Sequence, residues 1–312
     1  MNIKGLVIRA SHNIMIVRSG DEEIECRIKG KVLKGCENFY NPLAPGDLVM
    51  VEQKSANESA LILSVEKRRN FFSRYNQKGA ASQLLAANVD LVLCVTTPDS
   101  PPFRPRFLDR ILLQADIAEI DAVVICNKLD LEYDDIDFDE RIEEYKRIGY
   151  KILQISAKTG EGLDELRGLI TGKTCVLTGQ SGVGKSSIIN ALQPGLDLRE
   201  GVLNEKYNRG SHTTTLSMMF ELSWDGHNST KLIDTPGIRR FIPDGIDAQE
   251  VILHMREFAP LAGKCSFGMS CSHKTEPGCK IMEATAAGVI HEDRYESFLR
   301  IMDDLLGKNN DD

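Results

Sequence analysis

Short apolar runs separated by turn residues make up about the first seventy residues of the chain. Turn-forming residues lie between the runs, for example at 19–21 and 45–47. Runs of this length predict short strands, and hence a small barrel or sandwich. Five strands in this length fit a Greek-key barrel of the OB type, although periodicity alone does not separate it from an SH3-like barrel. The predicted strands cover residues 6–8, 14–17, 24–28, 48–51 and 61–65.

After Asn88 the pattern changes to continuous apolar runs that alternate with helical periodicity. This alternation predicts a mostly parallel sheet with helices on both faces. From about residue 246 the pattern is helical again, and it ends in the polar stretch 307–312. The predicted strands are 91–95, 122–126, 151–155, 175–178, 218–222 and 231–233, and the predicted helices are 106–117, 139–147, 162–170 and 185–192.

Length and composition narrow the class of protein. At 312 residues, with 42% hydrophobic and 27% charged residues, the chain is long enough for two or three folded modules. No apolar run has the length of a membrane span, and residues 1–10 lack the apolar core of a signal peptide, so we expect a cytoplasmic protein that does not enter a membrane.

The formal net charge of −8 argues against a protein that coats nucleic acid through bulk positive charge. Two local basic runs remain, and runs of this kind are more often solvated faces than binding sites. They contain Lys67, Arg68, Arg69 and Arg74, and then Arg104, Arg106 and Arg110.

A phosphate-binding loop follows the predicted strand 175–178 and precedes a predicted helix. Residues 179–186 match G-x-x-x-x-G-K-[ST] in this context. Glycines let consecutive backbone N–H groups point at phosphate oxygens, Lys185 supplies a positive charge, and the Ser186 hydroxyl can ligate Mg²⁺. The alternative is a glycine-rich turn that binds nothing.

Two further loops have the chemistry to recognise guanine. Asn127, Lys128, Leu129 and Asp130 follow the strand 122–126, and the Asp130 carboxylate can accept two hydrogen bonds from the guanine edge. The Lys128 stem can lie along the base plane. Alone, this tetrapeptide could also be a solvated loop. Residues 156–158 follow the next strand, where a backbone N–H can reach the guanine oxygen.

The segment 234–237 follows the strand 231–233. Asp234 suits a carboxylate that holds Mg²⁺ through water, with the Gly237 N–H on the γ-phosphate. Thr213, Thr214 and Thr215 precede it in a polar segment, where a threonine could complete the Mg²⁺ shell. The alternative for these threonines is the entry to a plain β-strand.

Three of the eight cysteines lie close together in the sequence, with one histidine between them. Cys265, Cys271, His273 and Cys279 have the spacing C-x₅-C-x-H-x₅-C. Three thiolates and one imidazole make a closed tetrahedral zinc set, which predicts a structural site. The alternative is a group of reduced thiols packed as small apolar side chains.

The motifs resemble the five GTPase signatures, but in the order G4 (127–130), G5 (156–158), G1 (179–186), G2 (near 213–215) and G3 (234–237). The chain is therefore similar to circularly permuted GTPases. With a barrel before them and a Cys/His cluster after them, it closely resembles the RsgA family of small ribosomal subunit biogenesis GTPases. The resemblance covers essentially the whole chain. The expected nucleotide-binding residues are Asn127, Lys128, Leu129, Asp130, Ser156, Ala157, Lys158, Gly179, Gln180, Ser181, Gly182, Val183, Gly184, Lys185, Ser186, Ser187, Thr213, Thr214, Asp234 and Gly237, and the magnesium ligands are Ser186, Thr214 and Asp234.

The resemblance implies an α/β protein of three domains. These are an OB-fold RNA-binding domain at 1–73, a circularly permuted P-loop GTPase domain at 74–243 and a helical zinc-binding domain at 244–312. The family usually has four residues between the first two cysteine ligands, whereas this chain has the five residues 266–270. The segment after Gly237 runs directly into the C-terminal domain, so a γ-phosphate signal could pass to it.

The family also implies function. It points to GTP hydrolysis coupled to late maturation of the small (30S) ribosomal subunit, by a protein that is monomeric when free and binds 16S rRNA through the barrel and the zinc module. Ile238 stands where Ras-like enzymes have the glutamine that orients water. Slow intrinsic turnover and activation by a partner are implied, and His212 matches the family's switch histidine as the catalytic candidate.

Three alternatives remain open at this stage. The first is a permuted GTPase with a different client, and the second is a nucleotide-dependent RNA-binding switch with negligible catalysis. The third, an ATP-dependent P-loop kinase, leaves Asp130 without a purpose.

Overall fold

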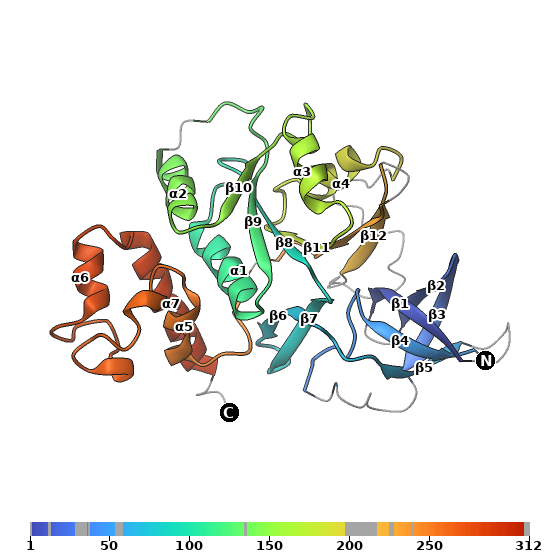
Figure 1. The fold of residues 1–312 in the computed structure, drawn as a ribbon, viewed down its shortest axis with the longest axis horizontal. Helices are drawn as coiled ribbons and strands as arrows, with labels where there is room; N and C mark the ends of the chain where they lie inside the picture. Colours follow the sequence, from blue (N-terminus) through green and yellow to red (C-terminus); the bar gives the residue numbers. More distant parts are fainter. Residues whose placement is uncertain are drawn as a thin grey trace.

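The computed structural model describes residues 2–11, 14–28, 36, 38–53, 59–133, 136–196, 217–224, 228–238 and 240–308. A strand barrel and a helical module lie at opposite ends of the molecule, with a parallel sheet and its helices between them (Figure 1).

Five strands near the N-terminus close into a ring. They pair in the order β1-β2-β3-β5-β4, and β4 pairs back to β1. All pairs are antiparallel except β3 with β5, and this Greek-key closure is that of an OB barrel, not an SH3-like one. Apolar side chains such as Val7, Val17 and Ile62 fill the interior. The strands are β1 (Asn2–Ala10), β2 (Met15–Ser19), β3 (Glu22–Ile28), β4 (Leu48–Glu52) and β5 (Ala60–Val65), so the predicted barrel is confirmed.

A separate hairpin connects the barrel to the central sheet. Strands β6 (Phe71–Asn76) and β7 (Ala81–Ala87) pair antiparallel with each other and with no strand of the large sheet. The apolar pattern of the sequence did not predict this hairpin, and the expected domain boundary at residue 73 falls inside β6. Phe39, which precedes β4, forms a bridge with Ser82 of β7, so the barrel and the hairpin are in contact.

The central sheet has the strand order β10-β9-β8-β11-β13-β12. The first five strands are parallel, and β12 runs antiparallel to β13. A single pairing of Arg9 with Met218 joins this sheet to β1 of the barrel. The strands are β8 (Leu91–Thr96), β9 (Asp121–Cys126), β10 (Lys151–Gln154), β11 (Thr174–Gly179), β12 (Met218–Leu222) and β13 (Thr230–Asp234).

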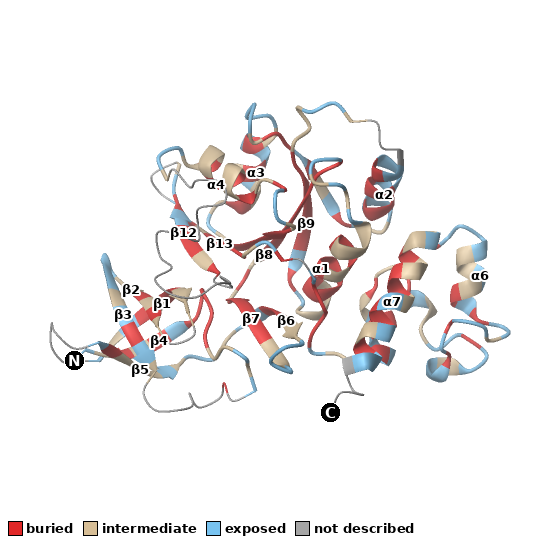
Figure 2. Ribbon diagram, turned by 180° about the vertical axis from the view of Figure 1, so that it is seen from behind, coloured by how far each residue is buried: buried red, intermediate tan, exposed pale blue. Residues whose placement is uncertain are grey.

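Helices cover both faces of this sheet, as the alternation of strands and helices predicts. Val92, Cys94 and Val124 point to one face, where they pack with α1 and α2. Leu91 and Leu93 point to the other face and pack with α3 and α4. The strands are therefore buried on both sides, which Figure 2 shows as red ribbon between the helices. The helices are α1 (Pro105–Ile117), α2 (Ile136–Arg147), α3 (Leu163–Ile170) and α4 (Lys185–Leu192).

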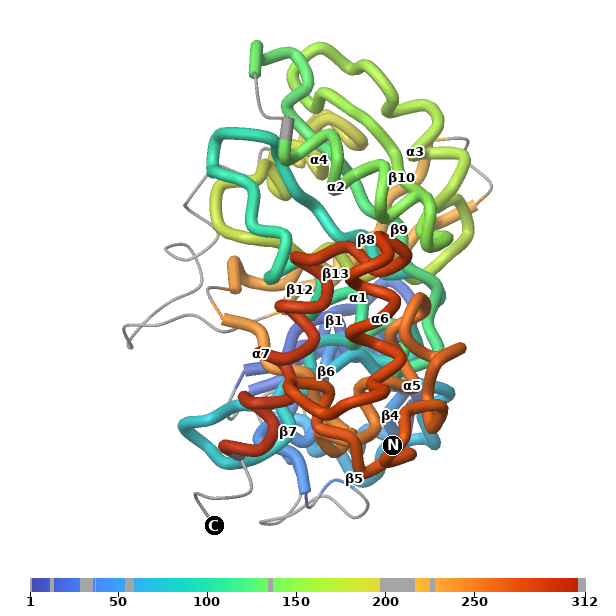
Figure 3. Tube along the Cα trace, turned by 90° about the vertical axis from the view of Figure 1, so that its left-hand side faces the viewer, coloured from blue at the N-terminus to red at the C-terminus, as the bar shows by residue number. Residues whose placement is uncertain are grey.

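The C-terminal module is helical and packs against α1. Phe258 and Phe298 stack at its centre with ring centroids 4.7 Å apart, and Leu113 of α1 belongs to the same apolar cluster. Figure 3 shows this module in front of the central sheet. In the described part of the chain, no helix combines the length and the apolar character needed to cross a membrane. The module contains α5 (Val251–His254), α6 (Lys280–Ala286), α7 (Glu292–Lys308) and the 3₁₀ turns η1 (Ala248–Glu250), η2 (Ala259–Leu261) and η3 (Gly268–Ser270).

The two basic runs are not simple solvated faces, because four of their arginines form ion pairs. These pairs join elements distant in sequence, including α1 with α7. They are Arg68 with Asp47, Arg69 with Asp90, Arg106 with Glu296, and Arg110 with Asp304.

A buried ionic network also fastens the C-terminal module to the central domain. The Asp109 carboxylate on α1 accepts hydrogen bonds from Arg294 of α7 at 2.8 Å and from the Tyr145 hydroxyl of α2 at 2.6 Å. Arg141 of α2 lies 3.3 Å from the same carboxylate, and Arg294 also donates to Glu257 at 2.6 Å. Breaking a buried pair leaves an uncompensated charge, so the loss of one partner in this network is expected to be costly.

Asp109→Asn is expected to lower the free energy of unfolding by about 3–5 kcal/mol at neutral pH, because two buried guanidinium groups lose their shared carboxylate. Burial alone would raise the pKa of Asp109, but Arg294 and Arg141 outweigh it and the pKa lies below its ordinary value. The stabilisation is therefore complete above about pH 4 and is lost as the pH falls through the lower folded-state pKa.

Urea unfolding of the parent and the variant, at pH 7 and in acid, measures this effect. The difference between their free energies of unfolding should be smaller in acid. Asp164→Asn is the control, since the Asp164 side chain is 97% exposed in its pair with Arg167. Its expected cost is about 0–1 kcal/mol. An Asp109→Asn cost no larger than that would contradict the role given to the network.

Candidate functional site

The described motif loops all leave the same edge of the central sheet. Residues 127–130 follow β9, 156–158 follow β10, the loop 179–186 follows β11, and 234–237 follow β13. These four strands are parallel, so their carboxyl ends meet at one edge, where ligands bind in open α/β sheets. Chain order is therefore irrelevant to the assembly of the site, and permuted motifs can build it.

The phosphate-binding loop depends on glycine geometry at two positions. Gly182 and Gly184 have φ values of +87° and +94°, a region that other residues adopt only with strain. A Cβ at Gly184 would lie 2.4 Å from Asn127 Nδ2, so the loop is also closely packed against the G4 motif. Lys185 begins α4 directly after this turn.

Lys185 and Asp234 form the charged base of the loop. The Lys185 ammonium donates to the carbonyl oxygens of Gly179 at 3.1 Å and Gln180 at 2.9 Å. Burial lowers the pKa of Lys185, and the charge of Asp234 opposes that effect. Burial raises the pKa of Asp234 to about 6, against the opposing charge of Lys185. Both groups are thus held in a water-poor site where charge interactions are strong.

Asp234 has the properties of a residue that binds a cation. Its Oδ1 is buried and has no hydrogen-bond partner among the described residues. Buried polar atoms normally have partners, and a carboxylate oxygen is a preferred ligand of hard divalent cations, directly or through water. The donor set at this edge therefore fits a bound divalent cation.

Asn127 holds three motif loops together. Its Nδ2 donates to the Val183 carbonyl in the phosphate loop at 2.9 Å, and its Oδ1 accepts from the Ala157 N–H in the G5 loop at 3.1 Å. Asn127 is 1% exposed, so these bonds are shielded from water. The residue expected to contact nucleotide thus also braces the loops that surround it.

Asp130 is held as an ionised acceptor beside the G5 loop. Ser156 Oγ donates to Asp130 Oδ1 at 2.7 Å, and Lys158 Nζ lies 3.5 Å from Oδ2. The hydrogen bond from Ser156 has the largest effect and lowers the pKa of Asp130, desolvation opposes it, and the charge of Lys158 adds a smaller lowering effect. Asp130 is therefore charged at neutral pH, as an acceptor of two guanine N–H groups must be.

Lys128 connects the phosphate loop to the loop between β8 and α1. It has a φ of +68°, and its ammonium donates to the carbonyl oxygens of Gly182 at 2.8 Å and Ser100 at 2.5 Å. Ser100 belongs to the loop between β8 and α1, which the sequence analysis did not include in the site. The proline-rich run 98–105 after a buried strand was the available signal, because it indicates a restrained loop at that edge of the sheet.

The G3 segment lies directly against the phosphate loop. A Cβ at Gly237 would come within 3.0 Å of Ser181 Cα, so the Gly237 backbone faces the loop closely. Ile238 is 5% exposed and packs in the core with α1 and α2. It therefore does not present a side chain to a water in the site. His212, Thr213, Thr214 and Thr215 lie outside the described residues, so their assigned roles stay predictions.

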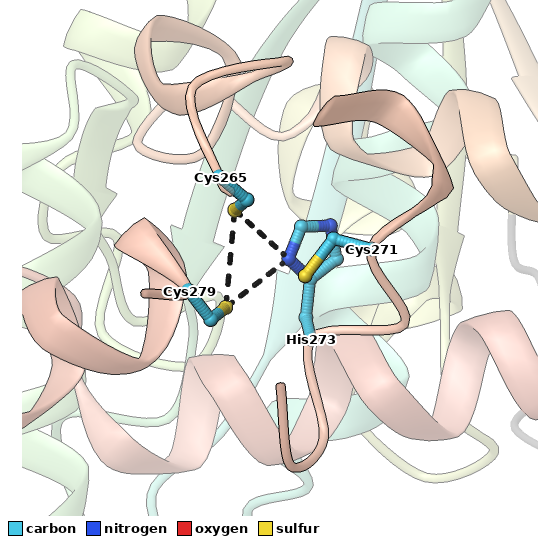
Figure 4. Close-up of side chains that lie close together, drawn as sticks. All are labelled: Cys265, Cys271, His273 and Cys279. Carbon is cyan, nitrogen blue, oxygen red and sulfur yellow. Dashed lines mark hydrogen bonds between the residues drawn. The ribbon is translucent and has the colours of Figure 1, made fainter. Parts of the chain in front are cut away.

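The Cys/His cluster of the C-terminal module comes together as its spacing predicts (Figure 4). The ligand atoms of Cys265, Cys271, His273 and Cys279 all lie within 4.8 Å of one another, and all four residues are buried. The distance from Cys265 Sγ to Cys279 Sγ is 3.9 Å, and His273 Nδ1 lies 3.6 Å and 3.4 Å from these two sulfurs.

These distances fit a tetrahedral metal site. With metal–sulfur bonds of about 2.3 Å and metal–nitrogen bonds of about 2.0 Å, a tetrahedron has edges of about 3.8 Å between sulfurs and about 3.6 Å from sulfur to nitrogen. The cluster can therefore bind a metal ion. The long spacer 266–270 does not displace Cys265 from the cluster, and η3 takes up three of its five residues in a tight turn. The Lys280 N–H, at 3.3 Å from Cys265 Sγ, helps to orient that ligand.

Gly184→Ala is expected to weaken GDP binding about tenfold or more, since the new Cβ meets an amide that is fixed by two hydrogen bonds and the backbone is strained. Fluorescent GDP titration measures the change. Gly172→Ala is the matched control, because Gly172 has a φ of +74° with nothing within 4 Å of its Cβ position. Equal affinities for the two variants would contradict the proposed loop packing.

The sheet order, the motif order and the loop geometry together define a circularly permuted P-loop GTPase. The family model described as RsgA GTPase matches residues 65–242. The chain is 36% identical over 307 residues to the small ribosomal subunit biogenesis GTPase RsgA of Bacteroides fragilis, covering 97% of both chains. It is 38% identical over 306 residues to the protein of the same name from Porphyromonas gingivalis, covering 96% of both. The chain therefore belongs to the RsgA GTPase family, and it is a GTP-hydrolysing enzyme.

Solved structures agree with this assignment. YjeQ from Thermotoga maritima matches with a TM-score of 0.71 and 30% identity, over 98% of this chain and 99% of that one. YloQ, described as a circularly permuted GTPase, matches in fold with a TM-score of 0.65 over 99% of this chain and 96% of that one. The predicted family and fold are thus confirmed.

Proposed function

We propose that this GTPase hydrolyses GTP to GDP and phosphate to assist late maturation of the small (30S) ribosomal subunit, in the cytoplasm and as a monomer when free. The observation that carries the proposal is that the permuted motif loops meet at one edge of the central sheet, between a barrel and a Cys/His module. The chain also matches small-subunit biogenesis GTPases along nearly its whole length.

At the nucleotide site, the backbone N–H groups of residues 179–187 bind the phosphates, and Lys185 neutralises charge at the β and γ positions. Ser186 and Asp234 hold Mg²⁺, and Thr214 is the third expected ligand. When bound, the ion stabilises charge on the transferring phosphoryl group. Asp130 selects guanine, and Ala157 and Lys158 border the base from the G5 loop. His212 remains our candidate for positioning the attacking water.

The Cys265, Cys271, His273 and Cys279 set holds one structural Zn²⁺. Three thiolates and one imidazole leave no open coordination position, which supports a structural role over a catalytic one. The ion would lie in the C-terminal module, which packs on α1. The domain boundaries that we propose from the sequence are 1–73, 74–243 and 244–312.

The barrel and the zinc module are proposed to bind 16S rRNA. OB barrels commonly hold oligonucleotides on a strand face and its loops. On the zinc module, Phe267 is 55% exposed on the loop between the first two cysteines, where an aromatic ring can stack on a base. With a net charge of −8, contact must depend on local fit rather than on bulk attraction.

Co-sedimentation with purified ribosomal subunits tests this proposal. We expect the protein to sediment with small subunits in the presence of a non-hydrolysable GTP analogue, less so with GDP, and not with large subunits. Equal sedimentation with both subunits, or with neither, would overturn it.

Burial of Ile238 favours one second candidate, a nucleotide-dependent RNA-binding switch whose slow GTP hydrolysis is not stimulated by the subunit. The two candidates differ in multiple-turnover phosphate release with small subunits. A rate that stays at the intrinsic level despite subunit binding would support the switch.

A further inference from the structure

The short segment that follows the G3 motif, residues 240–244, is held by three other parts of the molecule. We call it the post-G3 segment. Three residue steps separate Gly237 from Arg240, and a chain of that length spans at most about 11 Å. Whatever fixes the segment therefore limits how far Gly237 can move relative to the phosphate loop.

The hairpin and α1 hold the end of the segment through Asp244. The Asp244 carboxylate is 6% exposed and accepts hydrogen bonds from Ser73 Oγ of β6 at 2.9 Å and Ser82 Oγ of β7 at 3.0 Å. Its backbone N–H donates to Gln114 Oε1 of α1 at 2.7 Å. The Tyr75 N–H donates to the Ile242 carbonyl at 3.0 Å, so the main chain also pairs with β6.

The start of the segment contacts the C-terminal module. The Arg240 guanidinium pairs with Asp304 of α7 at 3.0 Å, and Asp304 also pairs with Arg110 of α1 at 2.7 Å. Phe241 between these two ends is 1% exposed and packs on Phe72 of β6, with ring centroids 5.8 Å apart. The hairpin, α1 and α7 thus all meet on residues 240–244.

We infer that the post-G3 segment is a mechanical anchor of G3, and that Asp244 and Arg240 are positioning residues that couple Gly237 to the hairpin and to α7. A displacement of either outer element shifts the segment, and with it the Gly237 N–H against the phosphate. Because coupling is reciprocal, nucleotide bound at Gly237 shifts the positions of the hairpin and α7 with the same coupling free energy.

This inference rests on the proposed function, because it describes how subunit contacts at the outer modules could regulate the nucleotide site. It also refines the expectation that a γ-phosphate signal passes directly along the chain into the C-terminal module. Side chains of β6, β7 and α7 contact the same segment, so they provide further contacts through which the signal can pass.

The test variant is the double substitution Ser82→Ala with Arg240→Gln. It removes one contact to the hairpin and one to α7, while Asp244 keeps Ser73 and Asp304 keeps Arg110, so no buried charge loses all its partners. Arg69→Gln is the control, because the Arg69 side chain is 59% exposed in its ion pair, as Arg240 is 60% exposed in its own.

Two measurements on the full-length protein are compared. Hydrogen exchange of α7 and the hairpin, with GDP and with a non-hydrolysable GTP analogue, tests coupling in the free protein. In the parent and in the control, we expect the exchange rates of α7 and the hairpin to differ between the GDP and GTP-analogue states. In the double variant, this difference should be smaller by about fivefold or more. GTP hydrolysis with small subunits should fall about tenfold in the double variant, with intrinsic kcat and KM within about twofold of the parent.

The outcomes separate the two claims. Absence of stimulation of the parent by small subunits would refute the proposed function, and the exchange measurement would still decide the anchor. The anchor would be overturned if the double variant kept both the nucleotide-dependent difference in exchange and the subunit stimulation of the parent. Equal losses in Arg69→Gln would overturn it as well.

Discussion

Replacing Asp130 with asparagine is expected to lower the affinity for GTP about a hundredfold or more, because two charge-assisted hydrogen bonds to the guanine edge are lost. The same variant should gain affinity for xanthosine triphosphate. Xanthine carries an oxygen where guanine has an amino group, and an amide can donate to that oxygen while it accepts from the ring N–H. Titration with fluorescent derivatives of both nucleotides measures the change in preference.

Asp121→Asn is the matched control for this prediction. Asp121 is exposed at the beginning of β9, whereas Asp130 follows the end of the same strand, so the control removes a carboxylate far from the site edge. Its preference for GTP should equal that of the parent. An Asp130→Asn protein that still prefers GTP by the parental factor would show that Asp130 does not read the base.

Removal of one thiolate from the Cys/His cluster should have the largest effect on stability. Structural zinc contributes about 10–16 kcal/mol to the folding of small zinc modules, and the described module has few other buried groups near its loops. Cys271→Ala is therefore expected to abolish stoichiometric metal and to unfold the loops 262–279, exposing them to limited proteolysis. Metal content by elemental analysis and the digestion pattern measure both effects.

Cys26→Ala provides the comparison, since Cys26 is equally buried but lies in the barrel. It should keep one metal ion per chain and an intact C-terminal module. Undiminished metal in Cys271→Ala, or equal loss in Cys26→Ala, would remove the cluster as the metal site.

Much of the fold follows from patterns that are local in the sequence. The strands of the barrel and the central sheet lie where short apolar runs predict them, because each buries an apolar side chain on one face or both. The hairpin was missed because β7 contains only Ala, Ser, Gln and Leu, without the β-branched or aromatic residues that favour strands. The hairpin also contacts Asp244 and Phe241, which are distant in sequence.

The meeting of the described motif loops at one edge of the sheet was predictable for a similar reason. Its motifs are contiguous, and each follows a strand whose parallel neighbours fix the loop at one edge. The proline-rich run 98–105 indicates a restrained loop at this edge, but it does not single out Ser100, which contributes only a backbone carbonyl. The network around Asp109 was also hidden, since its partner Arg294 lies 185 residues away along the chain.

The central claim of this account is that a permuted GTPase derives part of its activity from the small ribosomal subunit. Multiple-turnover GTP hydrolysis at fixed protein concentration, alone, with purified small subunits and with large subunits, tests it most directly. The account predicts slow turnover alone and strong stimulation by small subunits only. Equal rates under all three conditions would contradict it.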